Sequence, residues 1–527
     1  MNDAVYRNRS SLKKVLAVIT VIFVSAFLTG CSVLPTATVK NTWQSTKITP
    51  TKNATPSVTS FFTKAPNSTL LITTAPAFAA SPAPEISPTP TDATPTNPPA
   101  AAVKNVIIMI SDGWGYNQIL STDYFSAGRS GVQNYEAFPI RLAMSTYSLG
   151  QLTPADDQLG IYDPATIWSD FDRMKLYAAD SATAGTAMST GMKTYDAAIG
   201  VDPQLQNLEH IGQVFEDQGK MTGVVTSVEL SHATPASFVA HNADRSNYRQ
   251  IANEMIRDSA TDVIIGTGNP LYDDNGIART AANDSAYYDY VGGQETWDAL
   301  TAGTLGNDAN GDGKTEYWDL IQTKAEFEDL QTGPTPDRLI GVPQVFSTLR
   351  QARSGDATAG AYIVDFNRNL PNLALMSKVA LNVLDNDKDG FFLMIEGGAV
   401  DWAAHANQSG RLIEEQADFN AAVAAVCEWV NENSSWNDTL LIVTGDHETG
   451  YLTGSAGVYD QVVNNGKGMM PTMAWNSIGH TNQLVPFYAK GAGADIFDER
   501  ADLTDPVRGR YLDNTDISTA IRALITR

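Results

Sequence analysis

Five short segments of the chain are almost entirely apolar, and longer stretches with helical patterns separate them. The five segments cover residues 106–110, 223–226, 262–266, 391–395 and 440–444. A strand that is apolar on both faces belongs in a sheet covered on both sides, and such sheets are mainly parallel. Helical patterns at 373–384 and 411–431 would supply part of that cover. The sequence therefore predicts an α/β/α sandwich with a mainly parallel central sheet.

Two regions interrupt this alternation of strands and helices. Residues 270–335 are polar and rich in glycine and aspartate, and residues 452–475 have a loop-like composition with glycine and methionine. We expect both regions to be surface insertions close to the functional site or to an oligomer interface.

The first 31 residues have the pattern of an export signal. A basic head precedes an apolar stretch, Val15 to Leu28, that is too short to span a bilayer comfortably. The following residues, Leu28-Thr29-Gly30-Cys31, resemble a bacterial lipobox. We expect cleavage before Cys31 and lipidation of Cys31, which would tether the protein to an extracytoplasmic membrane face. A plain signal peptide or a weak membrane anchor is the alternative.

Residues 32–101 differ in composition from the rest of the chain. Twelve of the 25 prolines fall there, among abundant threonine, serine and alanine. Such a segment favours polyproline II over helix or sheet, so we expect an exposed, semi-rigid linker. Residues 102–527 then form the domain that carries the chemistry.

Charge and cysteine content limit the possible partners and cross-links. The net charge of −24 argues against nucleic acid or an acidic membrane surface as the main partner, because both require basic patches. With Cys31 lipidated, Cys427 has no cysteine left to pair with. Since Cys427 lies in an apolar helical pattern, we expect a buried, inert thiol.

Ser181 opens a run of small residues, 181–191, that predicts the start of a helix. A helix N-terminus presents free backbone N–H groups and a positive dipole, which suits a phosphate. A serine in this place can attack phosphorus if its pKa is lowered, and metal ions can lower it.

Potential metal ligands occur further along the chain. Asp112, Glu396 and Asp446 each end an apolar strand, so we expect them at one edge of the sheet. Asp401 and His405 are four residues apart and would share one helix face. Three ligands and an open position, with His480 as the third ligand, are the pattern of a catalytic zinc site. A second site would comprise Asp112, Asp446 and His447, and together these features indicate metal-assisted phosphoryl transfer.

The motifs at 104–113, 179–191 and 479–481 resemble those of the alkaline phosphatase family, and the resemblance covers nearly all of residues 102–527. It implies a homodimeric enzyme that hydrolyses phosphate monoesters through phosphoserine at Ser181 and releases inorganic phosphate. Arg245 would clamp the phosphoryl oxygens and Asp180 would orient Arg245. The implied ligands are Asp401, His405 and His480 for a first zinc, Asp112, Asp446 and His447 for a second, and Asp112, Thr234 and Glu396 for a third ion, usually magnesium.

Two positions depart from the best-known bacterial members of this family. His232 and Trp402 stand where those members have aspartate and lysine. An imidazole suits zinc or cobalt better than magnesium, so the change bears on the metal at the third site. His210 and His241 match no ligand position, and we expect structural roles for them.

Two segments fit calcium-loop patterns. Residues 385–396 match the EF-hand pattern literally, but 391–395 has the composition of a buried strand, so we expect a helix-to-strand turn. The loop from Asp308 to Asp319 lies in a polar insertion and is the better candidate for Ca²⁺. A plain Asp/Gly turn is the alternative there.

Other functions would use the same scaffold. A phosphodiesterase or sulfatase of the same superfamily is the nearest alternative, although Arg245 favours a monoester and no Cys/Ser-x-Pro-x-Arg signature occurs. A non-catalytic surface lipoprotein that binds phosphate is the alternative from a different class.

Overall fold

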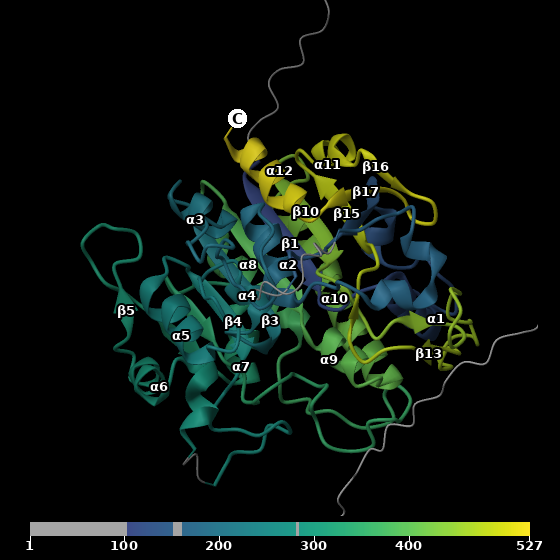
Figure 1. Ribbon diagram of the computed structural model, residues 1–527. Helices are drawn as coiled ribbons and strands as arrows, with labels where there is room; N and C mark the ends of the chain where they lie inside the picture. The colour runs from purple at the N-terminus through teal and green to yellow at the C-terminus, as the bar shows by residue number, and fades with distance from the viewer. Residues whose placement is uncertain (1–102, 151–160, 281–283, 527) are drawn as a thin grey trace, which may run out of the picture. The chain divides into compact units, whose positions relative to one another are not determined.

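The computed structural model describes residues 103–150, 161–280 and 284–526. Its centre is an eleven-stranded sheet in the order β16-β17-β2-β15-β10-β1-β9-β3-β4-β8-β7 (Figure 1). All neighbours from β10 to β7 pair in parallel. The strands predicted from the sequence are β1 (Asn105–Ser111), β3 (Met221–Glu229), β4 (Val263–Thr267), β9 (Phe391–Gly397) and β10 (Thr439–Gly445). The predicted fold class is confirmed.

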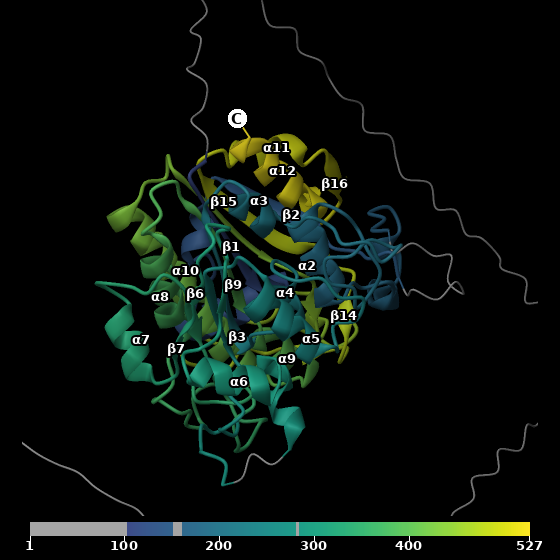
Figure 2. The same ribbon diagram turned by 90° about the vertical axis from the view of Figure 1, so that its left-hand side faces the viewer.

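Helices cover both faces of this sheet, which explains why its central strands are apolar throughout. Alternate residues of β1 belong to two separate cores: Ile108 and Ile110 to one, Ile107 and Met109 to the other. Figure 2 shows α8 and α10 on one side of β1 and β9, and α2 on the other. These helices are α2 (Ser181–Thr190), α8 (Leu373–Leu384) and α10 (Ser409–Asn433). Both helical patterns read from the sequence are therefore helices of the cover.

One end of the sheet is made of strands that the sequence pattern does not mark. β15 pairs antiparallel with both β10 and β2, and β17 pairs parallel with β2. Charged residues such as Arg141 and Lys490, together with Pro486, interrupt the apolar pattern in this part of the sheet. The strands concerned are β2 (Ile140–Ser145), β15 (Val485–Gly491), β16 (Leu503–Asp505) and β17 (Gly509–Asp513).

The two expected insertions differ in their structures. Within 270–335, β7 (Asp319–Ile321) pairs with β8 (Leu339–Gly341) as the edge of the main sheet. The side chains of Trp297, Trp318 and Phe327 are buried. This region is therefore a surface insertion only in part. Its buried apolar residues occur in short pieces between polar turns, so the composition of the region does not reveal them. Within 452–475 lie β12 (Leu452–Thr453) and β13 (Ala474–Trp475), which pair with each other.

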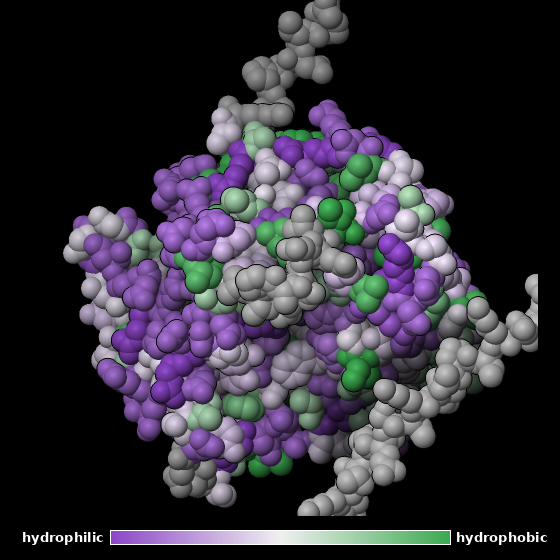
Figure 3. All heavy atoms as spheres, viewed as in Figure 1, coloured by the Kyte–Doolittle hydropathy of each residue, from purple (hydrophilic) through white to green (hydrophobic). Residues whose placement is uncertain are grey.

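The surface seen in Figure 3 is mostly hydrophilic, with scattered apolar side chains. None of the helices in the described ranges is long and apolar enough to cross a membrane. Cys427 is buried, and burial raises the pKa of its thiol to about 11, as expected for an inert cysteine. The lipobox with Cys31 and the linker at 32–101 lie outside the described residues.

Candidate active site at the carboxyl ends of the central strands

Three carboxylates meet where β10, β1 and β9 end side by side in the sheet. Asp112 follows β1, Glu396 lies near the end of β9, and Asp446 follows β10. All three are buried. The parallel order of these strands brings the three acids to one edge, as the sequence pattern predicts.

A first cluster of ligand atoms comprises Asp401, His405 and His480, whose donor atoms lie within 4.8 Å of one another. Asp401 and His405 share α9 (Ala399–His405), and His480 begins β14 (His480–Thr481). The Nε2 atoms of the two histidines are 3.0 Å apart. Each Nδ1 is held by a backbone carbonyl, that of Ile478 for His405 and that of Ala179 for His480. These bonds fix the tautomer and leave both Nε2 atoms directed at a common point, as metal-binding histidines require.

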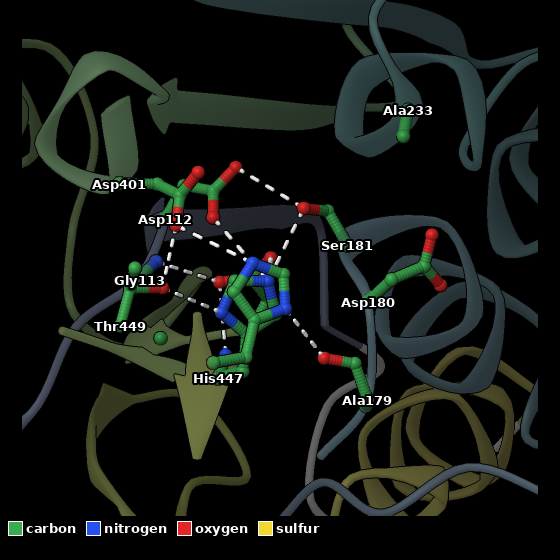
Figure 4. A network of polar contacts seen from close by, with 12 residues as sticks. Asp112, Gly113, Ala179, Asp180, Ser181, Ala233, Asp401, His447 and Thr449 are labelled. Atoms are coloured by element: carbon green, nitrogen blue, oxygen red, sulfur yellow. Dashed lines mark hydrogen bonds and ion pairs between the residues drawn. The ribbon is translucent and has the colours of Figure 1, made fainter. Parts of the chain in front are cut away.

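A second cluster lies next to Ser181 (Figure 4). The Nε2 atom of His447 is 3.2 Å from Asp446 Oδ2 and 3.6 Å from Asp112 Oδ1. Ser181 Oγ is 3.2 Å from the same nitrogen and donates a hydrogen bond to Asp112 Oδ2 at 3.4 Å. Asp401 also has a donor atom within 4.8 Å of those of Asp112 and His447, so the two clusters are adjacent.

The electrostatics of these clusters favour cations. Burial, followed by the neighbouring carboxylates of Asp446, Asp401 and Glu396, holds the pKa of Asp112 well above its usual range. Burial, followed by Asp401, raises the pKa of Asp446 to about 7. Burial and the adjacent His480 keep the pKa of His447 well below its usual range, so this imidazole is neutral and ready to bind a metal. Divalent cations would relieve the repulsion between the carboxylates.

Carboxylate oxygens without hydrogen-bond partners are a second reason to expect metal ions at these clusters. Among the described residues, Asp112 Oδ1, Glu396 Oε1 and Asp446 Oδ2 are buried oxygens that accept no hydrogen bond. Buried polar atoms without a partner are rare in folded proteins and often mark the place of a ligand or a functional strain. These oxygens belong to carboxylates at one edge of the sheet, so the ligands that would satisfy them are cations.

The expected third site lies around Glu396. Its Oε2 accepts a short hydrogen bond from the hydroxyl of Thr226, and the hydroxyl of Thr234 helps to offset the effect of burial on its pKa. His232 lies at the start of the short helix α4 (Ala233–Ala236). Its Nε2 is 3.4 Å from an Arg245 nitrogen, and Trp402 contacts its ring edge-to-face with centroids 5.7 Å apart.

Ser181 is the first residue of α2, and its side chain is almost fully buried. Asp180 caps this helix by accepting a hydrogen bond from the Thr183 amide at 3.0 Å, and the same oxygen accepts from the Ala197 amide at 3.1 Å. The other Asp180 oxygen accepts from Arg245 at 3.0 Å. One carboxylate therefore fixes both the helix N-terminus and the guanidinium that faces Ser181.

A cavity of about 510 Å³ joins these groups. Its walls come from Ser181, Arg245, the three residues of the first ligand cluster and four further residues. The lining residues are Ser181, His232, Arg245, Gln351, Asp401, Trp402, His405, Ala406 and His480. The cavity thus places an anion-binding group, a buried hydroxyl and metal ligands around one space.

The sequence model of the alkaline phosphatase family matches residues 103–505. The chain belongs to the alkaline phosphatase family. Alkaline phosphatase 4 of Bacillus subtilis (strain 168) is 32% identical over 358 residues, which cover 67% of this chain and 63% of that relative. The chain therefore matches a little less than two thirds of that relative's length.

Solved alkaline phosphatases share the fold. The enzyme from the Antarctic bacterium TAB5 is 25% identical, with a TM-score of 0.55 and coverage of 81% of this chain and 99% of that chain. A histidine-to-aspartate mutant of the TAB5 enzyme, solved with Mg bound in its M3 site, is 24% identical with the same TM-score, and covers 81% of this chain and 98% of that chain.

Some residues at this candidate site have no signal in the sequence. The Thr449 hydroxyl donates a short hydrogen bond to Asp401 Oδ1 and lies 3.3 Å from His447 Nδ1, so it contacts both ligand clusters. Gln351 comes from an irregular loop and lines the cavity. Neither residue stands in a motif, and only the folded chain brings them to the site.

The remaining predictions concern residues outside the candidate active site. His210 caps α3 (Ile211–Glu216), and His241 pairs with Glu254 at 2.9 Å, so both histidines have structural partners. Residues 385–396 form a turn followed by strand β9, as expected. In the other loop, Asp308, Asp312 and Glu316 have oxygens within 4.8 Å of one another. The expected last ligand, Asp319, instead begins strand β7.

Proposed function

We propose that the protein is a metal-dependent phosphomonoesterase that acts through a phosphoserine at Ser181. The observation that carries the proposal is the place of Ser181 Oγ. This hydroxyl lies at the N-terminus of α2, between the second ligand cluster and the cavity that Arg245 lines. A nucleophile, an anion clamp and metal ligands around one cavity are the parts that phosphoryl transfer requires.

Each of these residues has a defined task in the proposed reaction. Arg245 binds phosphoryl oxygens through two N–H groups, and Asp180 holds the guanidinium in place. The free N–H groups at the start of α2 add positive potential. Ser181 Oγ bonds to phosphorus while the bond from phosphorus to the alcohol oxygen breaks. Water then attacks the phosphoserine, which releases inorganic phosphate and restores the serine.

The metal assignment follows the family pattern. Asp401, His405 and His480 would hold one zinc, and Asp112, Asp446 and His447 a second. Asp112, Thr234 and Glu396 would hold a third divalent ion, with His232 and Trp402 beside it. Bound metals would lower the pKa of the serine hydroxyl and stabilise the charge on the attacking and leaving oxygens. The histidine-to-aspartate mutant of the TAB5 enzyme was solved with Mg bound in its M3 site. This supports a link between the presence of histidine or aspartate at position 232 and the ion at the third site.

The test combines three substrates with one variant. The zinc-loaded protein should hydrolyse p-nitrophenyl phosphate much faster than the corresponding diester or sulfate. Ser181→Ala should lose most of this turnover, and acid trapping with labelled substrate should give phosphoserine at residue 181 in the wild type only. Faster turnover of the diester or sulfate would assign the protein to the other enzyme class. Phosphate binding without turnover would make it a binding protein.

The organisation of the whole protein is part of the proposal. A lipidated Cys31 and the proline-rich linker 32–101 would hold the domain at 102–527 outside the cytoplasm and away from the lipid surface. The family also implies a homodimer, which sedimentation of the 102–527 domain would test. Metal analysis before and after chelation would count the zinc and magnesium, and also any calcium held by the loop of Asp308.

A further inference from the structure

We infer that His241 is a positioning residue for Arg245, and that it acts in its charged, doubly protonated form. The inference rests on the proposed function, in which Arg245 binds phosphoryl oxygens. His241 is not among the described residues that line the cavity. Its effect on a bound phosphate therefore passes through the loop of residues 241–245, which ends at the guanidinium.

Both ring nitrogens of His241 face oxygen atoms. Nδ1 lies 2.9 Å from Glu254 Oε1, and Nε2 lies 2.9 Å from the carbonyl oxygen of Leu208. A carboxylate and a carbonyl accept hydrogen bonds and donate none, so both nitrogens need a proton to satisfy them. A neutral imidazole has a single N–H group and serves only one of the two oxygens. The side chain of His241 is 8% exposed, which leaves water little access to replace a missing donor.

Four ionisable side chains from other elements face His241 or the ring stacked on it: Glu254 after α5 (Tyr248–Asn253), Glu209 and His210 before α3, and Arg522 on α12 (Thr515–Ile525). Burial, followed by the charge of His241, lowers the pKa of His210 to about 3, so His210 stays neutral. Arg522 forms an ion pair with Glu209. Burial opposes the charge of His241, but the hydrogen bonds to Glu254 and Leu208 outweigh it and hold the pKa of His241 above its ordinary value of 6.5.

The loop that begins at His241 is paired with a neighbouring backbone segment. Asn242 exchanges two backbone hydrogen bonds with Ile199, both of 2.8 Å. The Arg245 amide donates to the carbonyl of Ala197, also at 2.8 Å. The backbone of residues 242–245 therefore follows residues 197–199, and its register places the guanidinium.

Close packing transmits the position of the His241 ring to this pair of segments. Gly200 has a positive φ of 59°, and a Cβ atom there would lie 2.6 Å from the Ala240 carbonyl oxygen and 2.9 Å from a ring carbon of His241. Asp180 accepts hydrogen bonds from the 197–199 segment and from Arg245. A shift of the His241 ring would therefore disturb the backbone on which Arg245 and its carboxylate partner depend.

Loss of one proton from His241 would leave one oxygen without its donor. The bond to a carboxylate is the stronger one, so Nδ1 keeps its proton and Nε2 turns a lone pair toward the Leu208 carbonyl. Because the folded-state pKa is raised, both bonds are present below the ordinary pKa, and the second is lost as pH rises through the folded-state pKa. The loop is then held less firmly, and the affinity for phosphate should fall.

His241→Gln mimics the neutral ring, since its side chain is uncharged, does not titrate and has one nitrogen donor. Calorimetry on zinc-loaded protein that carries Ser181→Ala gives the Kd of inorganic phosphate without phosphorylation of residue 181. We expect His241→Gln to raise this Kd about 3- to 10-fold at pH 6.5, as for the loss of one hydrogen bond. At pH 9.5 the ratio of the two Kd values should approach one. The ionisation of phosphate affects both proteins alike and cancels in the ratio.

Two further variants separate charge from general stability. Glu254→Gln keeps an acceptor oxygen but removes the negative charge, so NMR titration of the ring protons should show a lower pKa for His241. The Kd of Glu254→Gln should accordingly rise at a lower pH than that of the parent protein. Asp289→Asn is the matched control, because it breaks the ion pair of 2.6 Å with Arg249 on the surface of α5. This control should leave the Kd unchanged at both pH values.

The outcomes distinguish this inference from the proposed function. A Kd ratio that is above one but equal at the two pH values overturns the inference, because His241 would then have only a structural role. A ratio of one at both pH values overturns it as well, and in either case turnover of monoesters keeps the proposed function. A ratio that falls with pH in a protein whose wild type hydrolyses no phosphate ester supports the role of His241 and removes the proposed function. A protein that binds no phosphate removes both.

Discussion

Substitution of Glu448 tests how firmly the surrounding structure holds His480, a proposed metal ligand. This carboxylate is buried directly after His447 and accepts four hydrogen bonds. The donors are Gln118 Nε2 at 2.9 Å, the Leu452 amide at 3.1 Å, Gln483 Nε2 at 3.1 Å and the Thr481 hydroxyl in a short contact. Through these bonds Glu448 ties α1 (Tyr116–Ala127), β12 and β14 together. It also extends the pairing of β11 (Glu448–Thr449) with β14, in which Thr449 lies opposite His480.

The cost of removing Glu448 can be worked out from these contacts. In Glu448→Leu, Gln118 and Gln483 keep a second acceptor, in Thr449 and Thr481 respectively. The Leu452 amide and the Thr481 hydroxyl lose theirs. At ~1–3 kcal/mol for each buried donor left without a partner, Glu448→Leu should lower the free energy of unfolding by about 2–6 kcal/mol. Burial raises the pKa of Glu448, which shows that the buried carboxylate is itself costly. Because Glu448→Leu removes this cost, we expect a loss of unfolding free energy in the lower half of that range.

Denaturant unfolding and zinc competition together test this reasoning. Glu448→Gln keeps one acceptor oxygen and should cost about half as much as Glu448→Leu. Because β14 carries His480, zinc affinity should also fall by roughly 10- to 100-fold, as it does when groups behind metal ligands are removed. Glu428→Gln is the matched control, since Glu428 is exposed and pairs with Lys378 on the surface at 3.3 Å. An unfolding midpoint and zinc affinity of Glu448→Leu equal to those of this control would refute the argument.

Four further perturbations give distinct readouts. Asp180→Asn keeps the acceptor for the helix cap but removes the negative charge beside Arg245. We therefore expect the Ki for inorganic phosphate to rise about 5- to 20-fold with little change in Tm. An unchanged Ki would contradict the role of Asp180 in orienting Arg245. His232→Asp should raise magnesium affinity in titrations of zinc-reloaded protein, and equal affinities would show that residue 232 does not set the third site. Burial raises the pKa of Glu415 from an ordinary value of 4.5 to about 8, so the folded chain keeps a proton that the unfolded chain releases, and stability is lost as pH rises between these values. Urea midpoints should therefore show Glu415→Gln gaining on the wild type from pH 5 to pH 8, and a constant difference would rule this out. Cys31→Ser should release an active protein from the membrane fraction, whereas a membrane-bound, uncleaved product would indicate a transmembrane anchor instead.

The sequence predicts those strands that are buried along their whole length and on both faces. Strands β1, β9 and β10 are buried on both faces, so their apolar character is visible without knowledge of their neighbours. β15 is not visible in this way, because Pro486 and Lys490 break its pattern and its place depends on antiparallel partners at both edges. Sequence patterns therefore predict the centre of the sheet better than its antiparallel end.

The same distinction applies to the site. Asp112 and Asp446 end apolar strands, and Asp401 and His405 share a helix face, so local patterns bring them together. Thr449 and Gln351 could not be predicted from local patterns. Their contacts with Asp401 and with the cavity depend on chain segments that are far apart in the sequence. A threonine or a glutamine in a loop has no preference that indicates such a contact.

The residues of the two ligand clusters are spread along almost the whole sequence of the folded domain. Asp112 follows the first strand of the sheet, whereas His480 enters only with β14, shortly before the closing strands β15 to β17. A growing chain therefore has no complete first cluster until residue 480 has been made and paired with β11. Because metal affinity depends on the assembled ligand set, tight binding of the proposed metal ions should follow synthesis of nearly the whole domain. Metal content would then serve as a quality check on complete chains, since a product that ends before β14 lacks a ligand however well its central sheet has formed.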